Sequence, residues 1–301
     1  MPFRRALFVV LAALCCGLAA CNDAPEPRLA GLLLTGDLDE ASGLAASHTH
    51  RNVLWLIEDG GNPAQLHAIN KRGTRLASFA IEGLVNTDWE DLAAFELDGK
   101  RYLLIADTGD NGGLRRTLLL HAVAEPEQLK EGQELRPAWS IAFRWPDGPR
   151  DCEAVAVDAA RRQILLISKK RQPPELFVLP LRPRASGVQT ARRIGSLADV
   201  PQASAEEQRV DPRSARIRSQ VTAASLAPDG RSLAVLTYQN LLLYPRRKAE
   251  TWAHALARPP QVHGLPWLHQ PEALSWSANG RGLYATGEFS PAPLLYVPVQ
   301  P

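Results

Sequence analysis

The chain has 301 residues, 45% of them hydrophobic, with 34 Lys and Arg against 32 Asp and Glu and a formal net charge of +2. A balance so close to neutral argues against a nucleic-acid-binding protein, which needs a basic stripe, and against electrostatic adhesion to a membrane. The length is ample for burying a core, either as one large all-β domain or as two ordinary domains.

The N-terminal segment, residues 1–20, has the pattern of an export signal. Arg4 and Arg5 form a positive region, and the apolar run after them is too short to span a bilayer as a permanent helix. The quartet Leu-Ala-Ala-Cys that ends at Cys21 resembles the lipobox of bacterial lipoproteins. That resemblance implies that Cys21 is acylated and becomes the new N-terminus. The alternative is an ordinary signal peptide that happens to carry a cysteine.

After the predicted cleavage, residues 21–27 form a polar, proline-containing tether for a domain at residues 28–301. The domain is therefore expected to be lipid-anchored to the cell membrane or the outer membrane, facing the periplasm or the exterior. Asn22 takes the place of the Asp that commonly retains lipoproteins at the inner membrane, while Asp23 leaves the choice of membrane open. Only Cys152 remains for a disulfide, so the mature chain cannot form an internal one.

The rest of the chain consists of short runs rich in Val, Ile, Leu, Phe and Tyr between Gly, Pro, Asp and Asn, which indicates an all-β domain. Five segments of this kind align as repeats. The last two share a hairpin signal, Asp229-Gly230 in one and Asn279-Gly280 in the other. The repeats begin at Ser42, Glu90, Glu153, Thr222 and Glu272.

Each repeat contains two further apolar runs and, in most cases, a more polar fourth run, which predicts a four-stranded blade. The domain is therefore predicted to be a single β-propeller of five blades. The fifth repeat lacks its fourth run, and we expect residues 28–38 to supply it, which would close the ring without an open sheet edge. The Arg-rich stretch at residues 203–219 is predicted to be an exposed insertion, and a degenerate sixth blade there is the alternative.

Polar residues recur where each predicted blade enters its first strand and leaves its second, and in a propeller these turns lie on one face. All fifteen such positions are polar, and nine are carboxylates. They either cap strands around a wet channel or form a cation site, because converging carboxylates repel one another unless a cation intervenes. The positions are Ser42, Glu90, Glu153, Thr222 and Glu272, then Glu40, Asp88, Asp151, Gln220 and Gln270 two residues earlier, and Asp59, Asp107, Lys169, Tyr238 and Glu288 after the second strands.

Oxygen ligands of this kind suit Ca²⁺ or Mg²⁺, and Ca²⁺ tolerates the irregular coordination that a ring of loops provides. The stretch at residues 107–113 supports this hypothesis, because its acidic and amide groups and its glycines resemble a calcium loop. It lacks the final Glu and the flanking helices of an EF-hand. The predicted metal ligands are Glu90, Asp107, Asp110, Glu153 and Glu272.

Basic side chains are predicted on the same face, at Arg115, Arg116, Lys169, Lys170 and Arg150. Together with a metal they would suit an anionic ligand, whereas salt bridges within the ring explain the same residues without a ligand. The predicted ligand-binding residues are Asp59, Asp88, Arg115, Lys169, Tyr238 and Glu288.

Signals for other chemistry are weaker. His269 is placed for a general base, with a plain surface role as the alternative. His48 and His50 fall on the opposite face, without further metal ligands in the sequence. Cys152 lies between two acids, which raises a thiol pKa and discourages a nucleophilic role. The sequence contains no Gly-x-Ser-x-Gly elbow, phosphate-binding glycine loop or Cys-x-x-Cys pair.

At its blade starts the chain resembles secreted bacterial propeller lipoproteins, the SdiA-regulated family and, more distantly, esterase-like phytase propellers. The residues concerned are EASGLAAS, DWEDLAAF, IADTGDN, DCEAVAVD and QPEALSWS. The resemblance spans the mature chain and implies the fold, but one propeller scaffold hosts many functions. It also implies that residues 88–91 and 107–111 face a metal or ligand. Gln220, Thr222 and Lys169 depart from a full multi-metal pattern.

Two functions are therefore open. The first is a monomeric binding module that holds a cation together with a small anionic ligand or a protein partner. The second is a metal-dependent hydrolase of a phosphoester, ester or lactone, with Glu90, Asp107, Glu153 and Glu272 as ligands or base. The binding module is favoured, because the sequence offers no identifiable nucleophile–base pair.

Overall fold

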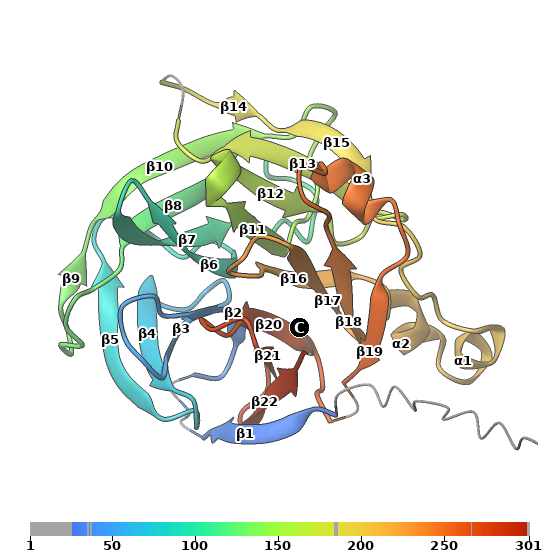
Figure 1. Ribbon diagram of the computed structural model, residues 1–301, viewed down its shortest axis with the longest axis horizontal. Helices are drawn as coiled ribbons and strands as arrows, with labels where there is room; N and C mark the ends of the chain where they lie inside the picture. Colours follow the sequence, from blue (N-terminus) through green and yellow to red (C-terminus); the bar gives the residue numbers. More distant parts are fainter. Residues whose placement is uncertain (1–25, 35, 37, 184–185, 266, 300–301) are drawn as a thin grey trace, which may run out of the picture.

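The computed structural model describes residues 26–34, 36, 38–183, 186–265 and 267–299. Within these ranges, five sheets are arranged around a central axis (Figure 1), so the domain is a five-bladed β-propeller, as predicted. The predicted signal peptide and Cys21 lie outside the described residues. In the described ranges, no helix has both the length and the hydropathy needed to cross a membrane.

The two inner strands of each blade form an antiparallel hairpin that carries the predicted apolar runs. The innermost strands contact one another in a closed ring around the channel. They are β2 (Ala41–Ala46), β6 (Trp89–Leu97), β11 (Ala154–Asp158), β16 (Val221–Leu226) and β20 (Pro271–Trp276). The second strands are β3 (Val53–Glu58), β7 (Lys100–Asp107), β12 (Gln163–Ile167), β17 (Ser232–Thr237) and β21 (Gly282–Gly287).

The two outer strands complete each blade. The third strands are β4 (Gln65–Asn70), β8 (Leu118–Ala124), β13 (Glu175–Pro180), β18 (Asn240–Pro245) and β22 (Ala292–Pro298). The outermost are β5 (Arg75–Ile81), β10 (Pro137–Arg144), β15 (Arg192–Ser196), β19 (Gln261–Gly264) and β1 (Arg28–Leu33). β1 pairs antiparallel with β22, with Leu29 opposite Leu295. The short strands β9 (Glu134–Leu135) and β14 (Gln189–Thr190) add in parallel to β5 and β10.

The apolar core is divided into five clusters, each shared by two neighbouring blades. The alternation of side chains along a strand explains this division. On β7, Leu104 and Ala106 pack toward the third blade, whereas Leu103 and Ile105 pack toward the first. A blade therefore buries both of its faces only when both of its neighbours are present.

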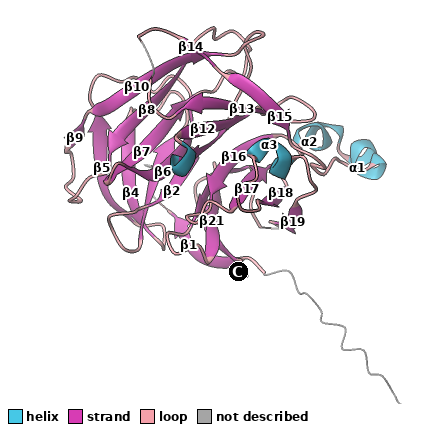
Figure 2. Cartoon of the chain, turned by 45° about the horizontal axis from the view of Figure 1, so that its top comes forward, coloured by secondary structure: helices cyan, strands magenta, loops and turns pink. Residues whose placement is uncertain are grey.

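The stretch at residues 203–219 is an insertion between the third and fourth blades and not a sixth blade. It forms two short helices, α1 (Ala205–Val210) and α2 (Pro212–Ile217), outside the ring of sheets (Figures 1 and 2). A capping box between Ser204 and Glu207 starts α1, and the Asp211 side chain caps α2. A third helix, α3 (Trp252–Leu256), precedes β19, and a 3-10 turn, η1 (Ala159–Arg161), joins β11 to β12.

Candidate cation site at the channel mouth

One mouth of the channel is formed by the turns that enter the first strands and leave the second strands. In every blade, a backbone N–H just after the second strand donates to the carbonyl two residues before the repeat start. This bond holds the predicted ring positions side by side. The five bonds are Asp59 to Glu40 (2.9 Å), Gly109 to Asp88 (3.1 Å), Lys169 to Asp151 (3.1 Å), Tyr238 to Gln220 (3.3 Å) and Glu288 to Gln270 (3.3 Å).

Five carboxylates from the first three blades come together at this mouth, which we call the acidic mouth. Glu90, Asp151 and Glu153 each place one oxygen within 4.8 Å of the other two. Asp59, Asp88 and Glu90 form a second group by the same measure. Glu90 belongs to both groups and is 4% exposed, while Asp151 and Glu153 are 3% and 2% exposed. The cluster is thus centred on the buried Glu90, with Asp151 and Glu153 also buried and with Asp59 and Asp88 half-buried.

The hydrogen bonds within the cluster satisfy only some of its carboxylate oxygens. Glu153 Oε1 accepts from the ammonium of Lys169, and Asp151 Oδ1 accepts from the backbone N–H of Asp110 at 2.8 Å. Lys170 Nζ lies 2.8 Å from Asp151 Oδ2. Among the described residues, however, no donor reaches the other oxygen of Glu153, or Oδ2 of Asp107. Buried carboxylate oxygens without a donor are costly and need a proton or a cation.

Glycine allows the carboxylates to approach the neighbouring loop. A Cβ on Gly109 would lie 2.1 Å from Glu90 Oε1 and 2.4 Å from Asp88 Cγ. A Cβ on Gly60 would lie 2.8 Å from Asp88 Oδ1. Any side chain at Gly109 would therefore displace Glu90 and Asp88, which both belong to the second carboxylate group.

Burial and mutual repulsion raise the pKa values of these acids. The pKa of Glu90 lies well above its usual range, chiefly because the side chain is desolvated and also because Asp59 and Asp88 are near. Desolvation raises the pKa of Asp59 to about 6 and also raises that of Asp88. The nearby guanidinium of Arg115 offsets part of the shift at Asp88. A cation in the cluster would relieve both causes.

Apart from these two carboxylate groups, a pair of acids, Glu272 and Glu288, lies at the fifth blade. The Tyr238 hydroxyl donates to Glu272 Oε1 at 2.6 Å, and the Gln270 amide donates to Glu288 Oε2 at 2.6 Å. Desolvation, followed by the interaction with Glu288, raises the pKa of Glu272 to about 9. The Glu272–Glu288 pair therefore retains a proton at neutral pH, and Glu272 lies outside both groups of converging oxygens.

The loop at residues 107–113 is organised by its own acids. Asp110 Oδ1 accepts the backbone N–H groups of Leu114 and Arg115, at 2.7 and 3.1 Å. Arg115 in turn donates to Asp107 Oδ1 at 2.7 Å and to the Gly109 carbonyl at 2.7 Å. Asp107 and Asp110 thus shape the wall of the acidic mouth, and each keeps one buried oxygen without a donor among the described residues.

Asp91, which follows Glu90, has a different role. Its Oδ2 accepts the backbone N–H groups of Val155 at 2.7 Å and Ala224 at 3.1 Å, and its Oδ1 accepts that of Leu92 at 2.8 Å. This fully buried carboxylate therefore joins the innermost strands of three blades. Its oxygens are occupied by backbone donors, so Asp91 is a structural residue of the channel.

Some of the predicted basic residues contact the acidic mouth, and others serve the structure. Lys169 lies against Glu153, with its ammonium 5.3 Å from the centre of the Tyr238 ring. Lys170 donates to Asn111 Oδ1 at 2.7 Å. Arg116 is exposed. Arg150 pairs with Asp147 and Glu175 and lies over the rings of Trp145 and Phe177, so it serves packing.

The structure also locates the histidines and the cysteine that the sequence offered as weaker candidates. His269 is exposed at the rim of a groove beside the acidic mouth. Cys152 is fully buried, and desolvation raises its thiol pKa, which removes the thiolate needed for nucleophilic chemistry. His50 Nε2 lies 2.8 Å from the Pro126 carbonyl. His48 lines a cavity at the other end of the channel.

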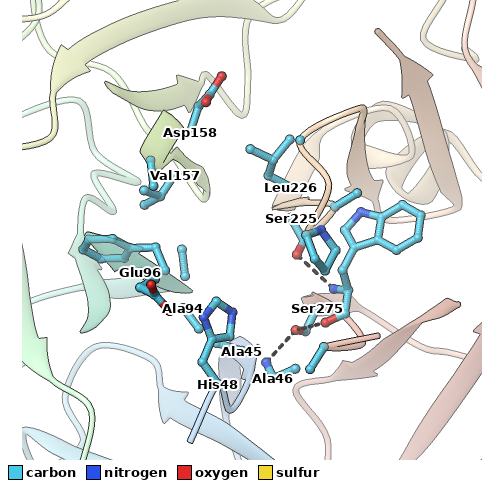
Figure 3. Close-up of a pocket in the computed structure, with 18 of the residues that line it drawn as sticks. Ala45, Ala46, His48, Ala94, Glu96, Val157, Asp158, Ser225, Leu226 and Ser275 are labelled. Atoms are coloured by element: carbon cyan, nitrogen blue, oxygen red, sulfur yellow. Dashed lines mark hydrogen bonds between the residues drawn. The ribbon is translucent and has the colours of Figure 1, made fainter. Parts of the chain in front are cut away.

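That other end, which we call the opposite mouth, holds a cavity of about 300 Å³ lined largely by small residues. Figure 3 shows His48, Glu96 and Asp158 around it, with Ser225 and Ser275 at its wall. The Ser275 hydroxyl accepts the Ala46 N–H at 2.8 Å, and the Ser225 hydroxyl accepts the Trp276 N–H at 2.9 Å. These two hydroxyls therefore join neighbouring blades.

The structure thus brings some of the predicted site residues together and separates others. Of the predicted metal ligands, Glu90 and Glu153 converge, whereas Asp107 and Asp110 form the adjoining loop and Glu272 pairs with Tyr238. Asp59 and Asp88, predicted as ligand-binding residues, lie with Glu90 in the second carboxylate group. Asp151 was not among the predicted ligands, although it occupies the same repeat position as Asp88.

Comparisons with known proteins give no family for this chain. No family model matches it, and no curated protein matches its sequence. The sequence resemblance to the SdiA-regulated and phytase propellers therefore has support only at the level of the shared propeller fold.

Proposed function

We propose that the acidic mouth binds a divalent cation and that the protein uses this ion to hold a ligand or partner. Two observations carry the proposal: one oxygen of Glu153 lies within 4.8 Å of oxygens of Glu90 and Asp151, and Glu153 keeps a buried oxygen that no donor of the described residues reaches. Carboxylates in the first three blades outnumber the basic groups that reach them. A divalent ion would supply the missing charge.

The kind of site favours Ca²⁺ over Mg²⁺. Ca²⁺ accepts carboxylate oxygens in the irregular geometry that a ring of loops provides, whereas Mg²⁺ demands a near-ideal octahedron. Glu90, Asp151 and Glu153 come from two different blades, and each brings one oxygen within 4.8 Å of the other two. Water or a ligand would complete the coordination shell.

Thermal unfolding with and without Ca²⁺ tests the proposal. Excess Ca²⁺, at about a hundred times its dissociation constant, should stabilise the protein by about 2.7 kcal/mol. Glu90→Gln should abolish this stabilisation. Glu96→Gln is the matched control, since Glu96 lies on the same strand at the opposite mouth. An unchanged melting temperature in Ca²⁺, Mg²⁺ and Mn²⁺ would overturn the proposal.

A metal-dependent hydrolase is the second candidate. One observation favours it, namely that Glu272, with a pKa of about 9, could donate a proton beside a metal-bound substrate. Binding remains the better-supported proposal, because no nucleophile–base pair lies at the mouth among the described residues. Turnover of phosphate or carboxylate esters that requires Ca²⁺ and disappears in Glu272→Gln would favour the hydrolase.

We further propose that Cys21 anchors the domain to a membrane through lipid, outside the cytoplasm. The lipobox-like quartet and the tether support this proposal. Metabolic labelling with palmitate should mark the wild-type protein and leave Cys21→Ser unlabelled. If wild-type and Cys21→Ser proteins both remain unlabelled, the anchor proposal fails without affecting the cation site.

A further inference from the structure

A groove of about 820 Å³ lies beside the acidic mouth, between the α1–α2 insertion and the fourth and fifth blades. It has one polar wall and one apolar wall. We call it the insertion groove. It is lined by Arg213, Ser214, Ile217, Arg218, Tyr238, His269, Gln270, Gly287, Phe289, Pro291, Ala292 and Pro293.

The insertion is fixed in place as a wall of this groove. The Arg218 guanidinium pairs with Glu207 of α1 and donates to the Gln239 side chain in the turn between β17 and β18. Ser219, at the end of the insertion, donates to Gln202 at 3.0 Å and accepts from Gln172 at 3.0 Å. These contacts hold α2 against the propeller, so the groove is a built feature of this face.

The charge of the insertion groove is opposite to that of the mouth beside it. No carboxylate lines it, whereas Arg213, Arg218 and His269 do. Among the described residues, the Arg213 guanidinium makes no ion pair or hydrogen bond, unlike that of Arg218, although its charge contributes to the lowered pKa of Asp211. An exposed arginine without an ion pair beside an apolar wall suits an anionic group.

The apolar wall and the link to the mouth complete the groove. Phe289 and Ile217 are 57% and 38% exposed. Tyr238 and Gln270 line the groove and also donate hydrogen bonds to Glu272 and Glu288 of the mouth. The groove and the mouth therefore share a wall one residue thick.

We propose that the insertion groove binds a small organic anion with an apolar body, and that an ion in the neighbouring cation site strengthens this binding across the shared wall. The charged group would lie at Arg213 and His269, and the apolar body against Phe289 and Ile217. A cation at the mouth would strengthen binding, because it adds positive charge beside the anion. This inference rests on the proposed cation site.

Calorimetric titration of the full chain with phenylacetate and phenyl phosphate tests the inference, in excess Ca²⁺ and in EDTA. Either anion, or both, should bind more tightly in Ca²⁺, and the preferred one identifies carboxylate or phosphate as the charged group. Arg213→Ala should weaken binding at least fivefold. Arg216→Ala is the matched control, because Arg216 lies on α2 without lining the groove.

The inference would be overturned by equal binding of the uncharged phenylacetamide, by unchanged affinity in Arg213→Ala, or by equal affinity of the anions in Ca²⁺ and EDTA. Stabilisation by Ca²⁺ without binding of either anion would also overturn it, while leaving the proposed cation site intact. Failure of Ca²⁺ to stabilise the protein would remove the cation site itself, so the two failures are distinguishable.

Discussion

Both mouths of the channel hold buried carboxylates, but the two ends satisfy them differently. At the opposite mouth, Asp158 Oδ2 accepts from Trp252 Nε1 at 2.8 Å and from Arg246 at 3.1 Å. On the same face, Glu125 accepts from Ser47, Thr49 and Trp55. At the acidic mouth, Glu153 has one charged partner, and no donor in the described part of the chain reaches its other oxygen.

The comparison teaches that burial of an acid does not by itself indicate a site. Trp and hydroxyl donors surround Glu125, so its charge is fully used in joining strands and turns. The acids of the acidic mouth face mainly other acids, which only a proton or a cation can compensate. The balance of donors to carboxylates separates a structural cluster from a binding cluster.

The largest expected effect is on stability, at the opposite mouth. Glu125→Ala removes the acceptor of the buried Ser47 hydroxyl and the Trp55 indole N–H, and leaves these donors unpaired. We expect a loss of about 3 kcal/mol in the free energy of unfolding, measured by urea denaturation. Calcium affinity should not change. A calcium affinity that fell together with stability would break the proposed separation of the two mouths.

A smaller effect is expected from Gly109→Ala at the acidic mouth. The added Cβ would displace Glu90 and Asp88, so calcium affinity should fall roughly thirtyfold, about 2 kcal/mol, in calorimetric titration. Gly112→Ala is the control, because a Cβ there meets only the Leu114 side chain, at 3.3 Å. Equal affinities for the two variants would mean that the ion does not bind at Glu90.

Lys169→Met should change calcium affinity in the opposite direction to Gly109→Ala. In the metal-free protein the Lys169 ammonium partly neutralises Glu153, and it would repel an ion bound there. Its removal should raise calcium affinity roughly tenfold, about 1.4 kcal/mol, and lower the stability of the metal-free protein. Lys100→Met, at an exposed position on β7, should change neither quantity. A weaker calcium affinity in Lys169→Met would contradict competition between the lysine and the ion.

The smallest effect, counted per pH unit, is that of pH on stability. The pKa values of Asp59 (about 6) and Glu272 (about 9) are raised in the folded state. The folded protein therefore binds more protons than the unfolded chain, and its stability falls as pH rises from about 4 to 9. In EDTA the melting temperature should drop by about 2 °C per pH unit. Glu272→Gln should flatten the curve above pH 7, and an unaltered slope would contradict the assigned protonation of Glu272.

Repetition in the sequence made the fold and the position of the acidic mouth predictable. Every blade repeats the same apolar runs, and the recurring turns identify the acids that share one face. The same logic could have identified Asp151, since it matches Asp88 in the repeat. Residues 203–219 were correctly predicted to be inserted, although the capping box from Ser204 to Glu207 could also have indicated a helix.

The partners of individual side chains were not predictable in this way. Glu90 and Asp91 are neighbours on β6, yet one faces other acids and the other accepts backbone donors from two further blades. Alternation predicts that they point to different sides, but not which distant donors they meet. Glu125 escaped notice because it follows a third strand and has no counterpart in a repeated turn.

The sharing of each core cluster between two blades has a consequence for the order of folding. The last cluster joins the fifth blade to the first, and β1 pairs with β22 near the other end of the chain. Formation of these contacts must wait until the final strand is available. Contacts so distant in sequence fold slowly. A nascent chain still lacking β22 would therefore keep apolar surface exposed long enough for chaperones to engage it.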